Sequence, residues 1–335
     1  MSIRIAINGF GRIGRCITRN VVDREDVELV AINDLADNEQ LAYLFERDTV
    51  HGTYPGEVES DEETISIDGE SIPSFSVADP AELPWDELEV DFALECTGQF
   101  RRREDAVGHL EAGAEYGLIS APGKGGIDYS VVMGVNEEGI APDSMDLIDV
   151  ASCTTNCLAP VAKVLHDEFE IERGLMTTVH SYTGSQALLD APNPKIRRGR
   201  AAAENMVPTT TGAAVAVTEV LPELEGRLDG MAVRVPTPDG SLIDLVATLG
   251  SDASVDAVNG ALREAANGEL EGILGYTDEP IVSSDILGDP RSSVVDGDST
   301  MMTGERTVKV ISWYDNEWGF ANRMLDVVEY IDEQT

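Results

Sequence analysis

Short apolar runs alternate with segments of helical periodicity over the first 150 residues of the chain. The runs at residues 3–7 and 27–32 predict buried strands, and a helix that ends at about Asp23 is expected between them. Further strands are predicted at residues 91–95 and 116–120, again with a helix between them. Strands that alternate with helices are typical of a doubly wound parallel sheet.

Two stretches depart from that alternation. Residues 53–76 predict short antiparallel strands inserted into the sheet, with Asp68-Gly69 as a hairpin turn. Beyond residue 153, strand-like runs occur with fewer helices; these runs lie at residues 175–179, 231–235, 244–249 and 308–313. The second stretch predicts an α+β domain built on a mixed or antiparallel sheet.

A glycine-rich turn links the first predicted strand to its helix. Gly9, Gly11 and Gly14 have the G-x-G-x-x-G spacing of a dinucleotide-binding turn, and Asp34 ends the second strand 20 residues after the last glycine. Such glycines let a pyrophosphate approach the helix N-terminus, while the acid can accept hydrogen bonds from ribose hydroxyls. Because Asp34 repels a 2′-phosphate and Leu35 offers no group to bind one, the pattern favours NAD over NADP.

These patterns divide the chain into three parts and predict an α/β fold. We expect a Rossmann-type NAD-binding domain over residues 1–152 and an α+β catalytic domain over residues 153–317. The remainder, residues 318–335, contains a final helix at about 322–330 with an apolar stripe. This helix is expected to pack back on the NAD-binding domain.

The charge balance changes what partners can be expected. The chain has 63 acidic and 23 basic residues, which gives a formal net charge of −40. Nucleic acid and anionic membranes would be repelled, so neither is expected as a partner. The acids are spread through periodic segments, which indicates a folded, halophilic type of protein whose self-repulsion is screened by high salt.

Cysteine usage and hydropathy bear on the compartment. No apolar run approaches the roughly 20 residues of a membrane span, and the first residues do not resemble a signal peptide. The four cysteines do not form the disulfide framework of a small secreted domain, and no further zinc ligands accompany Cys153 and Cys157. A reduced, cytoplasmic protein without a bound metal is expected.

Cys153 is the candidate nucleophile. It follows an apolar run at residues 145–150 and precedes a helical pattern, so that backbone N–H groups and the positive end of a helix dipole would meet its sulfur. That field favours the thiolate. His180 closes the run at 175–179 and is a candidate base. On position alone, a cysteine that merely packs in the core is an equal alternative.

A window without any acidic residue lies at residues 191–203 of this otherwise acidic chain. Its four cations are Lys195, Arg197, Arg198 and Arg200. The window indicates an anion-binding segment or a loop at a subunit interface, and both interpretations stay open. Downstream, the Thr211-Gly212 turn and Arg234 add hydroxyl, N–H and guanidinium donors, a combination that holds phosphate groups.

Several stretches, in order along essentially the whole chain, together resemble phosphorylating glyceraldehyde-3-phosphate dehydrogenases. They are residues 8–15, Ser152-Cys153-Thr154-Thr155-Asn156-Cys157, His180-Ser181-Tyr182-Thr183, Thr211-Gly212, Arg234-Val235-Pro236-Thr237 and Trp313-Tyr314-Asp315-Asn316-Glu317-Trp318-Gly319. The resemblance implies oxidation of glyceraldehyde 3-phosphate to 1,3-bisphosphoglycerate with NAD and inorganic phosphate, in glycolysis and gluconeogenesis. It also implies a homotetramer.

The resemblance carries roles over to particular residues. It implies that Cys153 forms a thioester and that His180 is the base. The residues expected to bind the substrate phosphate are Thr183, Arg198 and Arg234, and those for inorganic phosphate are Ser152, Thr154, Thr211 and Gly212. The expected cofactor residues are Gly9, Gly11, Arg12, Ile13, Gly14, Asp34, Ser120 and Asn316, the last of these at the nicotinamide carboxamide.

The sequence leaves alternatives open for both the function and the cofactor. Erythrose-4-phosphate dehydrogenase shares the scaffold, and its substrate differs by one carbon, a difference worth only about 1–3 kcal/mol in a pocket. A nonenzymatic NAD-binding regulator is a third reading, against which the presence of both Cys153 and His180 speaks. Asp190-Ala191-Pro192 lacks the leucine that NAD-preferring members often carry before the proline, which keeps NADP as a secondary cofactor.

Overall fold

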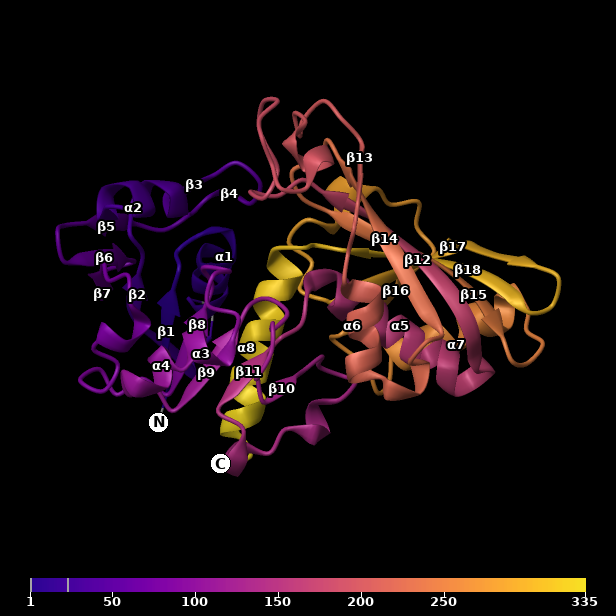
Figure 1. The fold of residues 1–335 in the computed structure, drawn as a ribbon, viewed down its shortest axis with the longest axis horizontal. Helices are drawn as coiled ribbons and strands as arrows, with labels where there is room; N and C mark the ends of the chain where they lie inside the picture. The colour runs from indigo at the N-terminus through magenta and orange to yellow at the C-terminus, as the bar shows by residue number, and fades with distance from the viewer. Residues whose placement is uncertain (1, 23) are drawn as a thin grey trace. The chain divides into compact units, whose positions relative to one another are not determined.

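The chain forms two compact units in a computed structural model that describes residues 2–22 and 24–335 (Figure 1). The first unit comprises Met1–Val131, Glu137–Ala151 and Ala321–Thr335, and the second comprises Val132–Asn136 and Ser152–Phe320. Compared with the expected bounds of 153 and 317, the second unit begins one residue earlier and ends three residues later, and it takes up the short segment 132–136.

The first unit is built on a nine-stranded sheet in the order β10-β11-β9-β8-β1-β2-β7-β6-β5. Its strands are β1 (Ile3–Asn8), β2 (Val27–Asn33), β5 (Val58–Ser60), β6 (Thr64–Ile67), β7 (Glu70–Phe75), β8 (Phe92–Glu95), β9 (Tyr116–Ile119), β10 (Tyr129–Ser130) and β11 (Leu147–Asp149). Pairing is parallel from β10 to β7 and antiparallel across β7-β6-β5. The predicted doubly wound sheet and its antiparallel insertion are therefore confirmed.

Helices accompany this sheet where the sequence alternates. They are α1 (Arg12–Val21), α2 (Asn38–Glu46), α3 (Arg103–Ala106) and α4 (Gly108–Glu111), with a two-stranded ribbon of β3 (Arg47–Asp48) and β4 (Gly52–Thr53) after α2. Asp68 and Gly69 both have positive φ, at 52° and 87°, which is the geometry of the predicted hairpin turn. The apolar residues of the central strands, among them Ile5, Ile7, Ile32, Leu94 and Leu118, are fully buried.

The second unit is built on a seven-stranded mixed sheet in the order β13-β14-β12-β15-β18-β17-β16. Its strands are β12 (Ile171–Ser181), β13 (Val207–Thr209), β14 (Leu228–Val235), β15 (Ser241–Leu249), β16 (Leu274–Thr277), β17 (Ser293–Thr303) and β18 (Thr307–Tyr314). The pairs β12–β14 and β16–β17 are parallel and the others antiparallel. The predicted α+β domain with a mixed sheet is confirmed.

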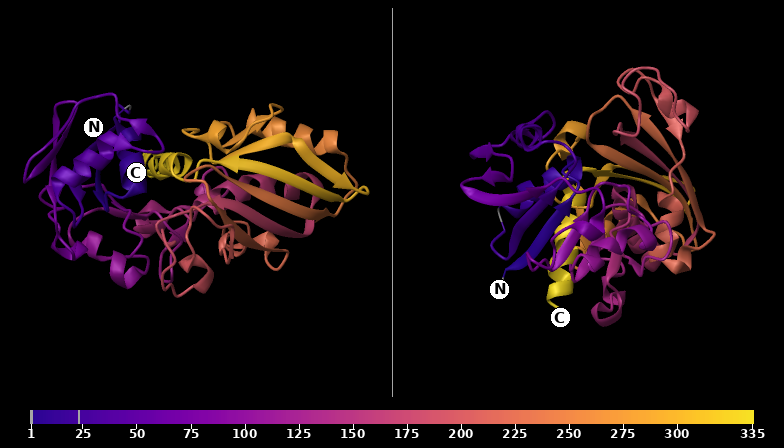
Figure 2. Two further views of the ribbon diagram at one scale, coloured as in Figure 1. Left: turned by 90° about the horizontal axis from the view of Figure 1, so that it is seen from above. Right: turned by 60° about the vertical axis from the view of Figure 1, so that its left-hand side comes forward.

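Three helices pack on this second sheet, as both ribbon views show (Figures 1 and 2). They are α5 (Cys153–Phe169), α6 (Ala213–Val220) and α7 (Val255–Ala266). The last helix, α8 (Trp318–Asp332), is longer at both ends than the sequence predicted, and its residues from Ala321 onward belong to the first unit. Among the described residues, no helix combines the length and apolar character needed to cross a bilayer.

Candidate active site

Cys153 is the first residue of α5 and follows the end of β11 after a three-residue turn, 150–152. Ala151 turns the chain with a φ of +52°, a conformation that costs a residue with a Cβ free energy. Ser152 then caps the helix, because its Oγ accepts a hydrogen bond from the Thr155 N–H at 3.0 Å. The predicted strand-to-helix junction is confirmed, with the sulfur in the first turn of the helix.

The Cys153 Sγ lies 3.6 Å from Nε2 of His180, which stands at the end of β12. On the other side of the ring, Nδ1 lies 2.8 Å from the carbonyl oxygen of Ser181. A carbonyl can only accept, so Nδ1 carries the proton in the neutral ring and Nε2 presents a lone pair to the thiol. The arrangement is a nucleophile and base in contact, with the base oriented by a third group.

Burial disfavours a charge on either member of this pair. It raises the pKa of the Cys153 thiol to about 11, although the Arg234 charge and hydrogen bonds with Thr154 act in the opposite direction. Burial, followed by the charge of Arg234, lowers the pKa of His180 to about 3. The helix dipole led us to expect a resting thiolate, but the cost of desolvating that charge acts in the opposite direction and is the larger effect. A proton that passes from Sγ to Nε2 creates both charges together, and their attraction at this distance offsets part of that cost.

Strand register brings Arg234 to the pair. In the parallel β12–β14 ladder His180 is directly opposite Arg234, so both side chains lie on the same face of the sheet. Arg234 Nη1 donates to the Ser181 carbonyl oxygen at 2.9 Å, the same oxygen that His180 Nδ1 contacts. The Nε of Arg234 is buried without a hydrogen-bond partner among the described residues. The guanidinium therefore retains donors for an anion.

The cations of residues 195–200 separate into different environments. Arg198 Nε donates to Thr209 Oγ1 at 3.0 Å and its Nη2 donates to the Thr210 carbonyl oxygen at 3.2 Å. Arg200 instead pairs with Asp190 at 3.0 Å. Lys195, which the sequence did not single out from its neighbours, donates to Thr210 Oγ1 at 2.9 Å.

The hydroxyls expected at the phosphate sites all have partners within the second unit. Ser152 Oγ contacts Thr155 Oγ1 at 2.7 Å, and the buried Thr154 hydroxyl contacts the Tyr314 hydroxyl at 2.8 Å. Thr183 Oγ1 lies 2.9 Å from Ser185 Oγ, and Thr211 Oγ1 accepts from the Ala213 N–H at 3.1 Å. Gly212 precedes α6, and a Cβ built there would meet no atom within 4 Å.

Asn316 is held in one orientation by two serines that sequence reasoning missed. Its Oδ1 accepts hydrogen bonds from Ser181 Oγ at 2.8 Å and from Ser241 Oγ at 2.6 Å. Because the oxygen is fixed, the Nδ2 group is the part of the amide that can donate to a ligand. Tyr314 was missed as well: it packs edge-on against the His180 ring and joins Thr154 to Thr178. Only the Trp313–Gly319 motif signalled its presence.

In the first unit, the glycine-rich turn fits a pyrophosphate. A Cβ at Gly9, whose φ is +99°, would lie 2.6 Å from the backbone nitrogen of Thr97, and one at Gly14 would lie 2.4 Å from the Gly9 carbonyl oxygen. By contrast, a Cβ at Gly11 would meet no atom within 4 Å. Gly9 and Gly14 thus serve close packing, while Gly11 leaves open space at the N-terminus of α1 for a ligand.

The turn lies beside Asp34 at the C-terminal edge of the sheet. The Phe10 N–H donates to Asp34 Oδ2 at 2.8 Å and the Ala36 N–H donates to Oδ1 at 3.0 Å, so the carboxylate is fixed next to the turn. Ser120 directly follows β9 at the same edge. Arg12 and Ile13 are the first two residues of α1, and the Arg12 guanidinium forms an ion pair with Asp48. Burial acts to raise the pKa of Asp48, but the hydrogen bond from Arg12 and those from backbone N–H groups outweigh burial and lower this pKa to about 2.

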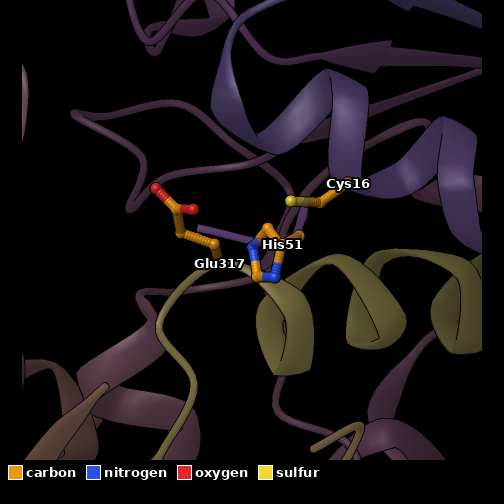
Figure 3. Close-up of side chains that lie close together, drawn as sticks. All are labelled: Cys16, His51 and Glu317. Carbon is orange, nitrogen blue, oxygen red and sulfur yellow. The ribbon is translucent and has the colours of Figure 1, made fainter. Parts of the chain in front are cut away.

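None of the four cysteines, all of which the structure describes, is in a disulfide. Cys157 is buried in the core, where its Sγ lies 3.3 Å from Ser293 Oγ. In the first unit, the buried Cys16 Sγ on α1 lies within 4.8 Å of a ring nitrogen of His51, which follows β3 (Figure 3). Cys153 is therefore distinguished by its contact with His180 and its place at a helix N-terminus.

Comparison with known proteins places this geometry in a family. Residues 3–103 match the family model described as glyceraldehyde 3-phosphate dehydrogenase, NAD binding domain, and residues 152–316 match the C-terminal domain of the same family. Over 331 residues the chain is 52% identical to the glyceraldehyde-3-phosphate dehydrogenase of Geobacillus stearothermophilus, covering 99% of this chain and 98% of that protein. Similar relatives, each named glyceraldehyde-3-phosphate dehydrogenase, come from Haloarcula vallismortis (53% identity; 99% and 98% covered) and Pseudomonas aeruginosa (54%; 97% and 97%).

The chain belongs to the glyceraldehyde-3-phosphate dehydrogenase family. The resemblance seen in the sequence is thereby confirmed over the full length. The matched NAD-binding domain is the part of the first unit that carries the open turn at Gly11 and the oriented Asp34, so NAD is the cofactor that this family membership and the residues both support. The relatives favour this family over the erythrose-4-phosphate alternative.

Proposed function

We propose that this protein oxidises glyceraldehyde 3-phosphate to 1,3-bisphosphoglycerate with NAD and inorganic phosphate, and catalyses the reverse reaction, in glycolysis and gluconeogenesis. The observation that carries the proposal is the 3.6 Å contact between Cys153 Sγ and the lone-pair nitrogen of His180, with Arg234 beside them. An aldehyde with a phosphate at its far end fits a nucleophile that has a guanidinium nearby.

The residues support a covalent route. Cys153 Sγ attacks the aldehyde carbon while His180 Nε2 takes the thiol proton and returns it to the carbonyl oxygen, so that the product is a neutral thiohemiacetal and Nε2 is free to accept again. NAD, when bound, would supply the acceptor for the hydride of that carbon. His180 Nε2 takes the hydroxyl proton as the carbonyl re-forms, which leaves a thioester on Cys153. Inorganic phosphate then attacks the thioester, and the sulfur leaves as the product is released. The Cys153 N–H, at the start of α5, would stabilise the negative oxygen in these steps.

Two anion subsites serve this route. Thr183, Arg198 and Arg234 would hold the substrate phosphate, since Arg234 reaches the pair from β14. Ser152, Thr154, Thr211 and Gly212 would hold inorganic phosphate. Arg198 also donates hydrogen bonds to Thr209 and Thr210, the two residues that precede Thr211. Asn316 Nδ2 would donate to the nicotinamide carboxamide.

We further propose a homotetramer. The outward face of the second sheet carries exposed apolar side chains on four strands: Leu175, Met231, Val246 and Met301. Strand register aligns Leu175 with Val246 and, across Lys309, with Met301, and we call this row the apolar stripe of the sheet. Exposed apolar side chains gathered on a sheet face support a surface that a further subunit would cover.

We propose that the protein works in the salt-rich, reducing cytoplasm of a halophile. Five of the described acidic residues are buried, namely Glu95, Asp149, Asp239, Asp296 and Asp315, and the others lie at half-buried or exposed positions, which supports an acidic surface. The chain has a candidate nucleophilic thiol, and none of its four cysteines, all of them described, is in a disulfide, which supports a reducing compartment. NADP stays a secondary cofactor, which the Asp34 carboxylate disfavours.

The proposal is tested by following NADH formation from glyceraldehyde 3-phosphate and NAD in molar KCl, with and without inorganic phosphate. Sustained turnover that requires phosphate is the expected result, since the thioester is released by phosphate. Steady turnover without phosphate would mean hydrolysis of the thioester, and would contradict the proposed reaction. Erythrose 4-phosphate, offered in parallel, measures the competing specificity.

A further inference from the structure

The loop of residues 191–203, which contains cations but no acidic residue, contacts Thr209 and Thr210 in the second unit. Lys195 Nζ donates to Thr210 Oγ1 at 2.9 Å, and Arg198 contacts the neighbouring Thr209 hydroxyl and the Thr210 carbonyl oxygen. The next two residues, Thr211 and Gly212, precede α6. Two cations from one loop are thus hydrogen-bonded to Thr209 and Thr210, directly before the two residues that the proposed function gives to inorganic phosphate.

These cations lack acidic partners in a chain dominated by acids. Within residues 2–22 and 24–335, ion pairs engage Arg200 with Asp190, but none involves Lys195, Arg198 or Arg234. The three charges act on one another: partial burial and then the charges of Arg198 and Arg234 lower the pKa of Lys195. Three mutually repelling cations, in a protein with a net charge of −40, form a site whose electrostatic balance calls for an anion.

Lys195 differs from the two arginines in the donors that it offers. An ammonium group has three N–H donors, of which one goes to Thr210 Oγ1 and two are left for other acceptors. Its flexible stem lets it act as a point charge that follows a mobile ligand, whereas a guanidinium holds a fixed fork. Inorganic phosphate, which must enter, attack and leave in each cycle, is such a ligand.

We propose that Lys195 is a further ligand of inorganic phosphate, acting from Thr210 beside Thr211 and Gly212. This inference rests on the proposed phosphorolysis and adds to it a residue that binds the attacking anion. Arg234, which is attached to Ser181 beside His180, serves the substrate phosphate instead. The proposal thus assigns Lys195 to one of the two anions.

The test compares Lys195→Gln with Lys195→Arg and with the control Lys163→Gln. Lys163 lies within α5, pairs with Asp167 and Glu269 on the surface, and gives the same substitution with the same change of net charge. Steady-state rates are measured in constant molar KCl while phosphate and glyceraldehyde 3-phosphate are varied separately. Lys195→Gln should raise the KM for phosphate about tenfold through loss of a charge-assisted hydrogen bond, with kcat and the aldehyde KM within about twofold.

The two other variants complete the expected pattern. Lys195→Arg should restore the phosphate KM to within about threefold of the unmodified protein, because it keeps the charge, and Lys163→Gln should not change it. A rise confined to the aldehyde KM would assign Lys195 to the other anion and overturn the proposal. Unchanged KM values for both anions, or an equal effect of Lys163→Gln, would overturn it too.

A second readout does not depend on turnover. Inorganic phosphate bound beside Cys153 should slow alkylation of that thiol by iodoacetamide, and Lys195→Gln should raise the phosphate concentration for half-protection about tenfold. An unshifted concentration would contradict the role of Lys195. If the unmodified protein turned over without phosphate, the proposed function itself would fail, and that result is read before any variant is compared.

Discussion

At the level of single residues, the chemistry depends on which nitrogen of His180 faces Cys153. The Ser181 carbonyl oxygen takes the proton side of the ring, so the basic nitrogen is directed at the sulfur. The same oxygen receives Arg234 Nη1. One backbone carbonyl thus orients both the base and the guanidinium.

His180→Gln should lower kcat by about 10²–10⁴-fold, because it removes the proton acceptor from both proton transfers. In this variant the thiolate must form without a neighbouring imidazolium. Burial already raises the pKa of Cys153 to about 11, so loss of that counter-charge should leave still less thiolate, and iodoacetamide should alkylate Cys153 more slowly at pH 7. Alkylation and turnover measured from pH 5 to pH 10 check this, and equal alkylation rates in both proteins would refute the role of His180.

Arg234→Leu should raise the KM for glyceraldehyde 3-phosphate by about tenfold to a hundredfold, since charge-assisted hydrogen bonds to a phosphate are lost. The phosphate KM should change much less. Initial rates with each ligand varied separately supply the comparison. If only the phosphate dependence moved, the two anion subsites would have to be exchanged.

At the level of elements, the β1–α1 turn divides its glycines by what surrounds them. The Cβ positions of Gly9 and Gly14 run into backbone atoms, while that of Gly11 points into open space. Their common spacing in the sequence conceals this difference, because it depends on how closely β8 and the turn approach one another. A residue can therefore be required for packing or for a ligand within the same motif.

Gly14→Ala and Gly11→Ala should separate these two effects. The Gly14 variant forces its Cβ against the Gly9 carbonyl oxygen and should lower the free energy of unfolding by about 1–3 kcal/mol. The Gly11 variant should leave Tm nearly unchanged but weaken NAD binding about tenfold or more, since the methyl group occupies the place of the pyrophosphate. Thermal melts and NAD titrations by calorimetry test both; unaltered NAD binding in Gly11→Ala would argue against this site.

At the level of the whole molecule, the dominant feature is the large net negative charge. A net charge of −40 on 335 residues opposes compaction and subunit association at low ionic strength. The Debye length falls from about 10 Å at 0.1 M salt to about 3 Å at 1 M, which screens repulsion between surface carboxylates. The apolar stripe on the second sheet and the acidic surface thus act against each other in a salt-dependent way.

Tm and the assembly state should both rise between 0.1 M and molar KCl. Calorimetry and sedimentation over that range, with sodium sulfate and choline chloride as controls for ion-specific effects, provide the measurement. A Tm that is independent of salt would show that the acidic surface is not a salt adaptation.

Much of the fold could be predicted from the sequence, because apolar periodicity is local. The strands β1, β2, β8 and β9 appear within about two residues of the predicted runs, and the 53–76 insertion forms β5 to β7. Short elements escaped prediction: β3, β4 and β10 have only two residues each, too few for any periodicity. The strand β17 was missed as well, since its buried face includes small polar residues such as Ser293.

The sequence by itself determined the chemistry that is present: a glycine-rich turn with Asp34, a cysteine at a helix start, a histidine at a strand end and a cation-only loop in an acidic chain. Only the tertiary structure decided how these groups act. The β12–β14 register puts Arg234 opposite His180, the Ser181 carbonyl selects the tautomer, and Lys195 reaches Thr210 from 15 positions away in the chain. The thiol's high pKa is likewise a property of burial. Residue type and local periodicity are written in the order of the chain, whereas distance, desolvation and hydrogen-bond partners depend on which distant segments the fold brings together.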